Sequence, residues 1–230
     1  DIVSACDAVV SVSDSCASML VEEIPEIEKK IVVISNMIDV ATLIRKAELD
    51  CPYKRSKGIK RIVTVCRISP EKHIENVIYA AKQLKENGIN FCWHIVGDGA
   101  NISEMKKSAY MYEVENCVVF EGRKINPYPY MLQADLYVHP SYVESQGLTV
   151  LEAMSLGVPC VVTKSRGPSE FLEHGNNGYM VEQSPNALAE GVLRILMDET
   201  LYSKVKAGSK CPEKFLPDVV MRRIDDLFCN

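Results

Sequence analysis

The chain has 230 residues, of which 47% are apolar and 25% are charged, and its formal net charge is −5. This composition is ordinary for a globular protein long enough to bury one large or two modest cores, and the negative charge excludes a general nucleic-acid-binding role. No stretch approaches the roughly 20 consecutive apolar residues of a membrane-spanning helix. We therefore expect a cytoplasmic protein, with attachment to a membrane surface through a missing part left open.

The nine cysteines form no CxxC pair, and several lie in or beside apolar runs. This pattern is typical of small buried thiols in a reducing compartment. The chain begins with Asp1 and in the middle of a strand pattern. We therefore expect a piece of a longer protein.

Short apolar runs alternate with amphipathic patterns along the chain. The sequence predicts a strand within 6–13, a helix after it that Ser13 or Asp14 caps, a strand at 31–34 and a polar connector over 45–60. From residue 61 on, the predicted strands are 61–66, 91–96, 117–120, 136–138, 159–162 and 179–181. The predicted helices between and after them are 69–88, 101–114, a short one near 126–130, one from about residue 147, and 188–196. Because the strands are continuous apolar runs, we expect an α/β fold with a parallel sheet covered on both faces.

Ligands of such sheets gather at the carboxyl ends of the strands, and the segment ESQGLTVLE over 144–152 follows one of them. Its helix should begin near Gly147, so the first N–H groups have no partner in the helix and favour an anion such as phosphate. Glu152 lies about one and a half turns further in and suits a sugar diol, although two glutamates at this spacing are also common on solvated helices. The backbone amides concerned are those of Gln146, Gly147, Leu148 and Thr149.

Two other loops belong to the same predicted rim. Arg67 and Lys72 follow the strand at 61–66 and suit a diphosphate, although such a pair is also frequent on ordinary surfaces. The run from Gly97 to Gly99 begins like a dinucleotide motif, but Ile102 stands at the third glycine position, which argues against a dehydrogenase. These glycines therefore indicate a sharp turn or close approach to a ligand.

The four histidines have no spacing to cysteine or carboxylate that predicts a metal site. We expect structural or surface roles for them and keep His139 as a residue of the rim. The four are His73, His94, His139 and His174.

Six stretches together resemble a known family: RIVTVCRISPEK, HIVGDGA, VVFEGR, NPYPYMLQADLYVHPS, ESQGLTVLEAMSLGVPCVVT and EHGNNGYMVE. In order and spacing they are similar to the retaining GT-B glycosyltransferases of group 1, the family 4 type that includes capsular and lipopolysaccharide sugar transferases. The resemblance covers the chain from residue 7 on and is strongest over 126–181. It implies two Rossmann-like domains, each a doubly wound parallel sheet, that face each other across a cleft.

The resemblance also implies a division of the chain and a role for each site residue. Residues 1–36 resemble the end of the acceptor-binding domain, 37–60 a linker, 61–214 the nucleotide-sugar-binding domain, and 215–230 a helix that crosses back. Arg67 and Lys72 resemble the diphosphate-binding pair, and Cys66 and His73 stand where glycines are usual. The remaining roles are Glu144 at the donor sugar, Glu152 at the ribose, Gln146, Gly147, Leu148 and Thr149 as an amide cradle, and Arg123 and Lys124 beside the base.

The expected reaction is transfer of a hexose-type sugar from a nucleoside-diphosphate sugar to a saccharide or lipid-linked acceptor, with retention and with no metal or other cofactor. The missing N-terminal domain is an expected partner, so the piece alone should bind donor and transfer poorly or not at all. Two alternatives remain. A nucleotide-sugar 2-epimerase would change the donor without an acceptor, and a non-catalytic nucleotide-sugar-binding module would bind donor without turnover.

Overall fold

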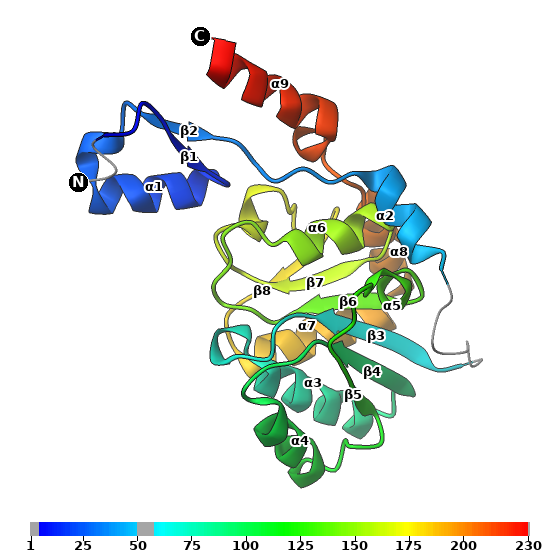
Figure 1. The fold of residues 1–230 in the computed structure, drawn as a ribbon. Helices are drawn as coiled ribbons and strands as arrows, with labels where there is room; N and C mark the ends of the chain where they lie inside the picture. The colour runs from blue at the N-terminus through cyan, green and yellow to red at the C-terminus, as the bar shows by residue number, and fades with distance from the viewer. Residues whose placement is uncertain (1–4, 50–57, 230) are drawn as a thin grey trace.

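The largest part of the molecule is a six-stranded parallel sheet in the order β5-β4-β3-β6-β7-β8 (Figure 1). The computed structural model describes residues 5–49 and 58–229. The chain moves outward from β3 toward one edge and from β6 toward the other, which is the doubly wound arrangement and confirms the predicted Rossmann-like fold class. The strands are β3 (Lys60–Val65), β4 (Phe91–Val96), β5 (Val118–Gly122), β6 (Leu136–His139), β7 (Cys160–Thr163) and β8 (Tyr179–Val181).

Helices cover both faces of this sheet and bury a separate apolar core on each. Successive strand residues point to opposite faces; Ile62 belongs to one core and Val63 to the other, and both are fully buried. This is why the strands read as unbroken apolar runs. One core is closed by α3 (Ile74–Glu86), α4 (Ile102–Met111) and α7 (Pro185–Met197), with α8 (Glu199–Gly208) against α7. The other is closed by α2 (Val40–Ala47), α5 (Tyr128–Leu132) and α6 (Leu148–Ser155).

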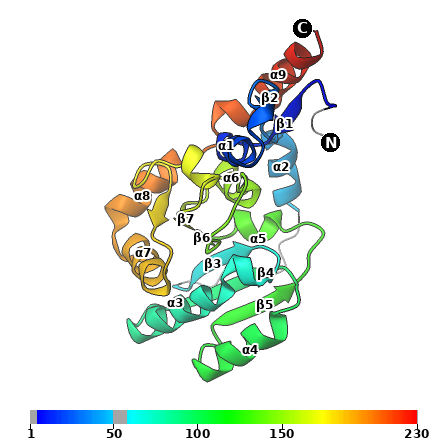
Figure 2. The same ribbon diagram turned by 90° about the vertical axis from the view of Figure 1, so that its left-hand side faces the viewer.

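A smaller unit from the start of the chain lies to one side of the sheet (Figures 1 and 2). Ser13 caps its helix, as predicted, by accepting a hydrogen bond from the Cys16 N–H. The last helix reaches this unit, since Arg223 Nη1 donates to the Val33 carbonyl oxygen at 3.3 Å. The elements concerned are β1 (Val9–Ser11), α1 (Asp14–Glu23), β2 (Ile31–Val33) and α9 (Pro217–Cys229).

The structure corrects two predicted helices. The helix over 69–88 is interrupted, because Pro70–Lys72 forms a 3₁₀ turn and α3 begins only at Ile74. Between them His73 has φ 47°, in the left-handed region, and its ring stacks on Tyr142 at 3.7 Å. The helix over 101–114 ends earlier, at Met111. His73 stands where the resemblance predicts a glycine, and it adopts the left-handed backbone conformation that glycine favours.

Two further expectations meet the structure only in part. The polar connector over 45–60 begins inside α2, which packs on α5 and α6, and residues 50–57 of it lie outside the described part. The described cysteines carry free thiols, and burial raises the pKa of Cys66 to about 12. Among the described residues, no helix has the length and apolar character needed to cross a membrane.

Candidate functional site

The candidate site lies between β3 and β6, where the order in which the chain adds strands to the sheet reverses. These strands are hydrogen-bonded neighbours, yet the chain continues from β3 into α3 on one face and from β6 into α6 on the other. The two loops therefore part and leave a crevice at the carboxyl edge. A cavity of about 270 Å³ opens there, lined by Asn36, by residues 65–67 and 72, and by residues 139 and 144–149. The cavity thus brings together Arg67 and Lys72, predicted from the loop after β3, and Glu144, predicted from the loop after β6.

Glu144 is held in the cavity by two partners on one oxygen. Its Oε1 lies 2.5 Å from Lys72 Nζ and 2.8 Å from His139 Nε2, and its side chain is 14% exposed. Burial raises the pKa of Glu144, but the hydrogen bonds and positive charge of His139 and Lys72 outweigh it and lower the pKa to about 2. Glu144 is therefore an ionised carboxylate whose second oxygen, Oε2, makes no hydrogen bond within the described part of the chain.

His139 is the residue of this group that the sequence identified least well. It ends β6, is only 1% exposed, and directs Nε2 at Glu144. Its Nδ1 lies 3.5 Å from the Tyr137 hydroxyl, which also donates to the Val65 carbonyl oxygen at 3.3 Å. Because the partner of Nε2 is a carboxylate, Nε2 carries a proton and donates it. The sequence predicted that His139 lies on the rim. It did not predict the contact with Glu144, which depends on the fold of the loop between them.

The start of α6 forms one wall of the cavity. The helix begins at Leu148, as predicted, after Gly147 in the left-handed region with φ 81°. A side chain at Gly147 would place its Cβ 2.7 Å from Pro168 Cγ. Within residues 5–49 and 58–229, the N–H groups of residues 146–149 donate to no protein acceptor. The positive end of the helix dipole and these free donors suit an anionic group.

The side chain of Gln146 serves another purpose. Its Oε1 accepts hydrogen bonds from the Asn36 backbone N–H at 3.1 Å and from Asn36 Nδ2 at 2.6 Å, and its Nε2 donates to the Asn36 carbonyl oxygen at 3.2 Å. Gln146 is 2% exposed. It therefore fixes the segment that links the smaller unit to the sheet, and only its backbone amide is free for a ligand. Sequence reasoning missed this pair, because the two residues are 110 positions apart.

Glu152 lies on the second turn of α6 in a different environment. Its Oε1 accepts a hydrogen bond from the Tyr128 hydroxyl at 2.9 Å. Burial raises the pKa of Glu152, although the Tyr128 hydrogen bond and the charge of Lys46 work against that shift. Sequence reasoning missed the contacts of Tyr128 and Lys46 with Glu152.

The other predicted residues lie in less enclosed positions. Arg67 lines the cavity with a side chain that is 74% exposed, and among the described residues its one ion pair is a 3.9 Å contact with Glu71. Arg123 is exposed, while Lys124 lies 3.6 Å from Glu121. Arg67 is thus free to turn toward a ligand.

Gly97 is required by the chain itself. It has φ 150°, and a Cβ there would lie 1.8 Å from the Cys66 carbonyl oxygen. A Cβ added at Gly99 would likewise lie 2.0 Å from the Ile68 carbonyl oxygen. These glycines let the loop after β4 lie against the loop after β3 and so support the cavity wall. Contact between Gly97 and a ligand stays a prediction.

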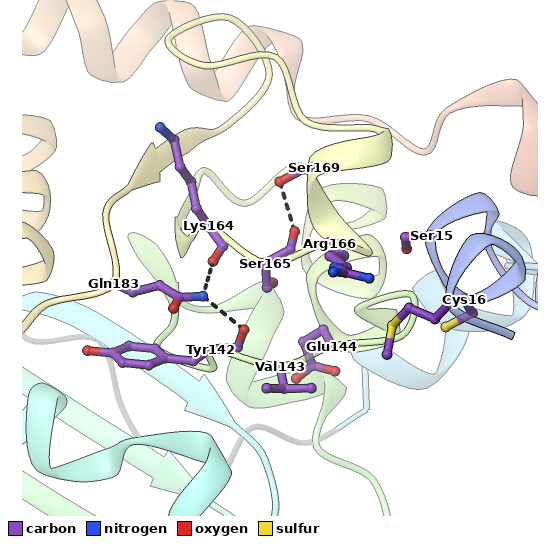
Figure 3. Close-up of a pocket in the computed structure, with 11 residues that line it drawn as sticks. Ser15, Cys16, Tyr142, Val143, Glu144, Lys164, Ser165, Arg166, Ser169 and Gln183 are labelled. Carbon is purple, nitrogen blue, oxygen red and sulfur yellow. Dashed lines mark hydrogen bonds between the residues drawn. The ribbon is translucent and has the colours of Figure 1, made fainter. Parts of the chain in front are cut away.

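A second pocket, of about 640 Å³, adjoins the cavity (Figure 3). Glu144 belongs to the lining of both. Its other walls come from α1 of the smaller unit and from the loop after β7. In the described residues, no three His, Cys, Asp or Glu side chains are grouped to hold a metal ion.

Comparison with known proteins adds a family to this geometry. The family "Glycosyl transferases group 1" matches residues 45–210. N-acetyl-alpha-D-glucosaminyl L-malate synthase of Bacillus anthracis is 27% identical over 228 residues, which are 96% of this chain and 59% of that protein. Poly(ribitol-phosphate) alpha-N-acetylglucosaminyltransferase of Staphylococcus aureus is 29% identical over 170 residues, 71% of this chain and 34% of that protein.

A solved structure shows the same fold. The Anabaena protein HepE, in complex with UDP and glucose, superposes with a TM-score of 0.84 at 22% identity, over 97% of this chain and 63% of that one. The chain therefore spans less than two thirds of each of these three proteins.

Proposed function

Because this chain belongs to the group 1 glycosyltransferases of the GT-B fold, we propose that it is the nucleotide-sugar-binding part of a retaining hexosyltransferase. In this proposal residues 61–214 hold the donor, residues 1–36 end the acceptor-binding domain, 37–60 link the two, and 215–230 cross back. The acceptor is a saccharide or a lipid-linked molecule.

One observation carries the proposal: an ionised carboxylate, a lysine and a row of free amides meet in one cavity. Glu144 and Lys72 are fixed against each other at 2.5 Å, and Oε2 of Glu144 is left for a ligand hydroxyl. The start of α6 faces the same space. Sugar hydroxyls need acceptors and a diphosphate needs donors and positive charge, and this cavity offers both.

The proposed chemistry uses these groups to stabilise the leaving diphosphate. The bond from the anomeric carbon to the diphosphate oxygen breaks, the acceptor hydroxyl oxygen forms a bond to that carbon on the same face, and the nucleoside diphosphate leaves with the bonding electrons and takes up the hydroxyl proton. Arg67, Lys72 and the amides of residues 146–149 face the charge that develops. Glu144 orients the sugar, and Glu152 accepts hydrogen bonds from the ribose hydroxyls. Arg123 and Lys124 border the base.

The relatives suggest which donors to test first. One of them is named an N-acetyl-alpha-D-glucosaminyl L-malate synthase and another an alpha-N-acetylglucosaminyltransferase, and the HepE structure holds UDP and glucose. UDP and its hexose and N-acetylhexosamine conjugates are therefore the leading candidates for this chain.

A thermal-shift and calorimetry screen tests the proposal. The chain is mixed with UDP, GDP, ADP and their sugar conjugates, and a ligand at 100 times its dissociation constant stabilises the fold by about 2.7 kcal/mol. Glu152→Ala should lose the shift, whereas Glu190→Ala, an exposed glutamate on α7, should keep it. Equal shifts in both variants would place the nucleotide elsewhere. Absence of any shift would contradict donor binding by this chain.

A further inference from the structure

We infer that the pocket of about 640 Å³ beside Glu144 binds an anionic group, a carboxylate or a phosphate, carried by the hydroxylated acceptor. The inference rests on the proposed transferase function, because that function makes the neighbouring cavity the donor site. It adds the chemical class of the second substrate.

The position of the pocket is that of a second reactant. It shares Glu144 with the smaller cavity, so a molecule in it lies next to whatever Glu144 contacts. Its lining comes from α1 on one side and residues 164–166 and 169 on the other, and it includes neither Arg67 nor Lys72. A ligand here therefore uses different charges from a donor diphosphate.

The acidic residues around the pocket are already paired. Glu144 is held by Lys72 and His139. Glu170, next to the pocket, accepts hydrogen bonds from the N–H groups of Asp14 and Ser15 at 3.3 and 2.7 Å and so caps α1. These carboxylates therefore already have hydrogen-bond or ion-pair partners within the described part of the chain.

The cations around the pocket differ from the acids. Lys164 forms an ion pair with Glu182. Arg166 is exposed, lines the pocket, and makes no hydrogen bond or ion pair with any residue that the structure describes. A guanidinium has five donors in a planar fork that matches a carboxylate or a phosphate. Arg166 is therefore the cation of the pocket lining that has no acidic partner among the described residues.

Ser165 supplies a second unsatisfied group. It lines the pocket and is 6% exposed, and its Oγ has no partner among the described residues. A buried hydroxyl without a hydrogen bond is uncommon and costs free energy until a partner arrives. Figure 3 shows Ser165 beside Arg166 on the same wall. One anionic group can accept from both.

The opposite side of the pocket is apolar. Met19 on α1 is 44% exposed and Val143 is 70% exposed. These side chains suit the carbon skeleton of a small molecule or the ring face of a sugar. The whole lining therefore fits a hydroxylated compound with one anionic end at Arg166 and its carbon frame against Met19.

The test is a binding titration of the chain saturated with UDP. Binding is monitored by NMR through the chemical shifts of the backbone amide resonances. The probes are L-malate for a carboxylate, glycerol 3-phosphate for a phosphate and glycerol as the neutral match. We expect an anionic probe to shift the resonances of residues 164–169, and the stronger of the two probes to show which anion the pocket takes. Glycerol should shift them less at the same concentration.

Variants separate this site from other sources of anion binding. Arg166→Gln should weaken binding of the anionic probe about fivefold, and Arg166→Lys should recover part of it. Arg222→Gln, an exposed arginine on α9, is the matched control and should bind as wild type. Equal binding by Arg166→Gln and wild type, or equal binding of glycerol and the anions, would overturn the inference.

The same samples distinguish this failure from failure of the proposed function. UDP affinity is measured for each variant in parallel, and Arg166→Gln should leave it unchanged. A chain that binds UDP but neither anion refutes the anionic acceptor alone. A chain that binds an anion at Arg166 but no nucleotide refutes the donor site. Loss of UDP affinity in Arg166→Gln would assign Arg166 to the donor and overturn the inference.

Discussion

The two ends of the segment 144–152 are both glutamates, but their pKa values are shifted in opposite directions. Glu144 shares one oxygen between Lys72 and His139, and its pKa falls to about 2. Glu152 is covered by protein, has a phenol as its hydrogen-bond partner, and its pKa is raised. Lys72 and His139 outweigh the burial of Glu144, whereas burial outweighs the stabilising partners of Glu152. The comparison teaches that the folded chain itself stabilises the charge of Glu144, while the charge of Glu152 is left for a ligand to stabilise.

The sign of each contribution to stability follows from the pKa shifts. A carboxylate with a lowered pKa in the folded state stabilises the fold above its unfolded pKa and loses that effect as the pH falls. A carboxylate with a raised pKa favours the fold only while protonated, and this advantage is lost as the pH rises through the folded-state pKa. At pH 7, Glu144 therefore supports the fold, whereas the ionised form of Glu152 opposes it.

Breaking the Glu144 end should have the largest effect. Glu144→Gln leaves Lys72, which is 16% exposed, without its carboxylate, so the free energy of unfolding at pH 7 should fall by about 2 to 3 kcal/mol in urea denaturation. Glu182→Gln, which breaks the exposed pair with Lys164, should cost less than about 1 kcal/mol. Similar losses in both variants would contradict the special role of the Glu144 pair.

A pH series sharpens the same comparison. Between the ordinary pKa of 4.5 and the folded value of about 2, the wild-type chain should lose the contribution of Glu144 as the pH falls. Glu144→Gln carries no titrating group there, so the difference in unfolding free energy between the two proteins should shrink over this window. A constant difference down to pH 2 would mean that the carboxylate charge is not the source.

Under the proposed function, transfer by the complete enzyme should depend on Glu144 and Lys72. Glu144→Ala and Lys72→Ala should each lower the transfer rate at least about tenfold, because the proposal places these side chains at the sugar and the diphosphate. Lys82→Ala, a partly exposed lysine paired with Glu86 on α3, is the matched control. Wild-type rates in the Glu144 or Lys72 variant would refute these roles.

The sequence predicted the parts of the molecule that depend on local patterns. Sequence reasoning found the strands around residues 62 and 93 and the start of α6 at Leu148. Apolar runs and helical periodicity are patterns of neighbouring residues, so they can be recognised without knowledge of the fold. The predicted start of α3 was wrong. Ser69 and Pro70 are typical of a helix start, but His73 has a left-handed backbone and stacks on Tyr142, a contact between residues far apart in the sequence.

The candidate site divides in the same way. Arg67, Lys72 and Glu144 were found because each follows a predicted strand, and strand ends of a parallel sheet share one edge. The partners that set the electrostatics were missed or underestimated. The hydrogen bonds between Gln146 and Asn36 span 110 residues, and the one that Tyr128 donates to Glu152 joins α5 to α6, whose spacing along the chain carries no periodic signal. Such contacts exist only once the chain has folded.

His139 tests the first end of the segment at a smaller scale. His139→Leu keeps an apolar group at a buried position but removes the Nε2 donor, so Glu144 retains Lys72 alone. We expect a loss of about 1 to 2 kcal/mol in unfolding free energy at pH 7. The pKa of Glu144, followed by NMR, should rise in this variant. An unchanged Glu144 pKa would show that Lys72 suffices to hold the carboxylate charged.

Glu152 tests the second end, where the smallest effect has the opposite sign. Glu152→Gln keeps an acceptor for the Tyr128 hydroxyl and removes a buried charge, so at pH 7 without ligand the chain should become more stable by about 0.5 to 1 kcal/mol. As the pH falls through the raised folded-state pKa of Glu152, the wild-type carboxyl takes up a proton and the gain should disappear. The same variant should bind the nucleotide more weakly, because an amide offers a diol one acceptor oxygen instead of two. A gain in stability with loss of binding means that the fold tolerates a costly carboxylate because a ligand needs it, whereas loss of stability would make Glu152 a structural residue like Glu144.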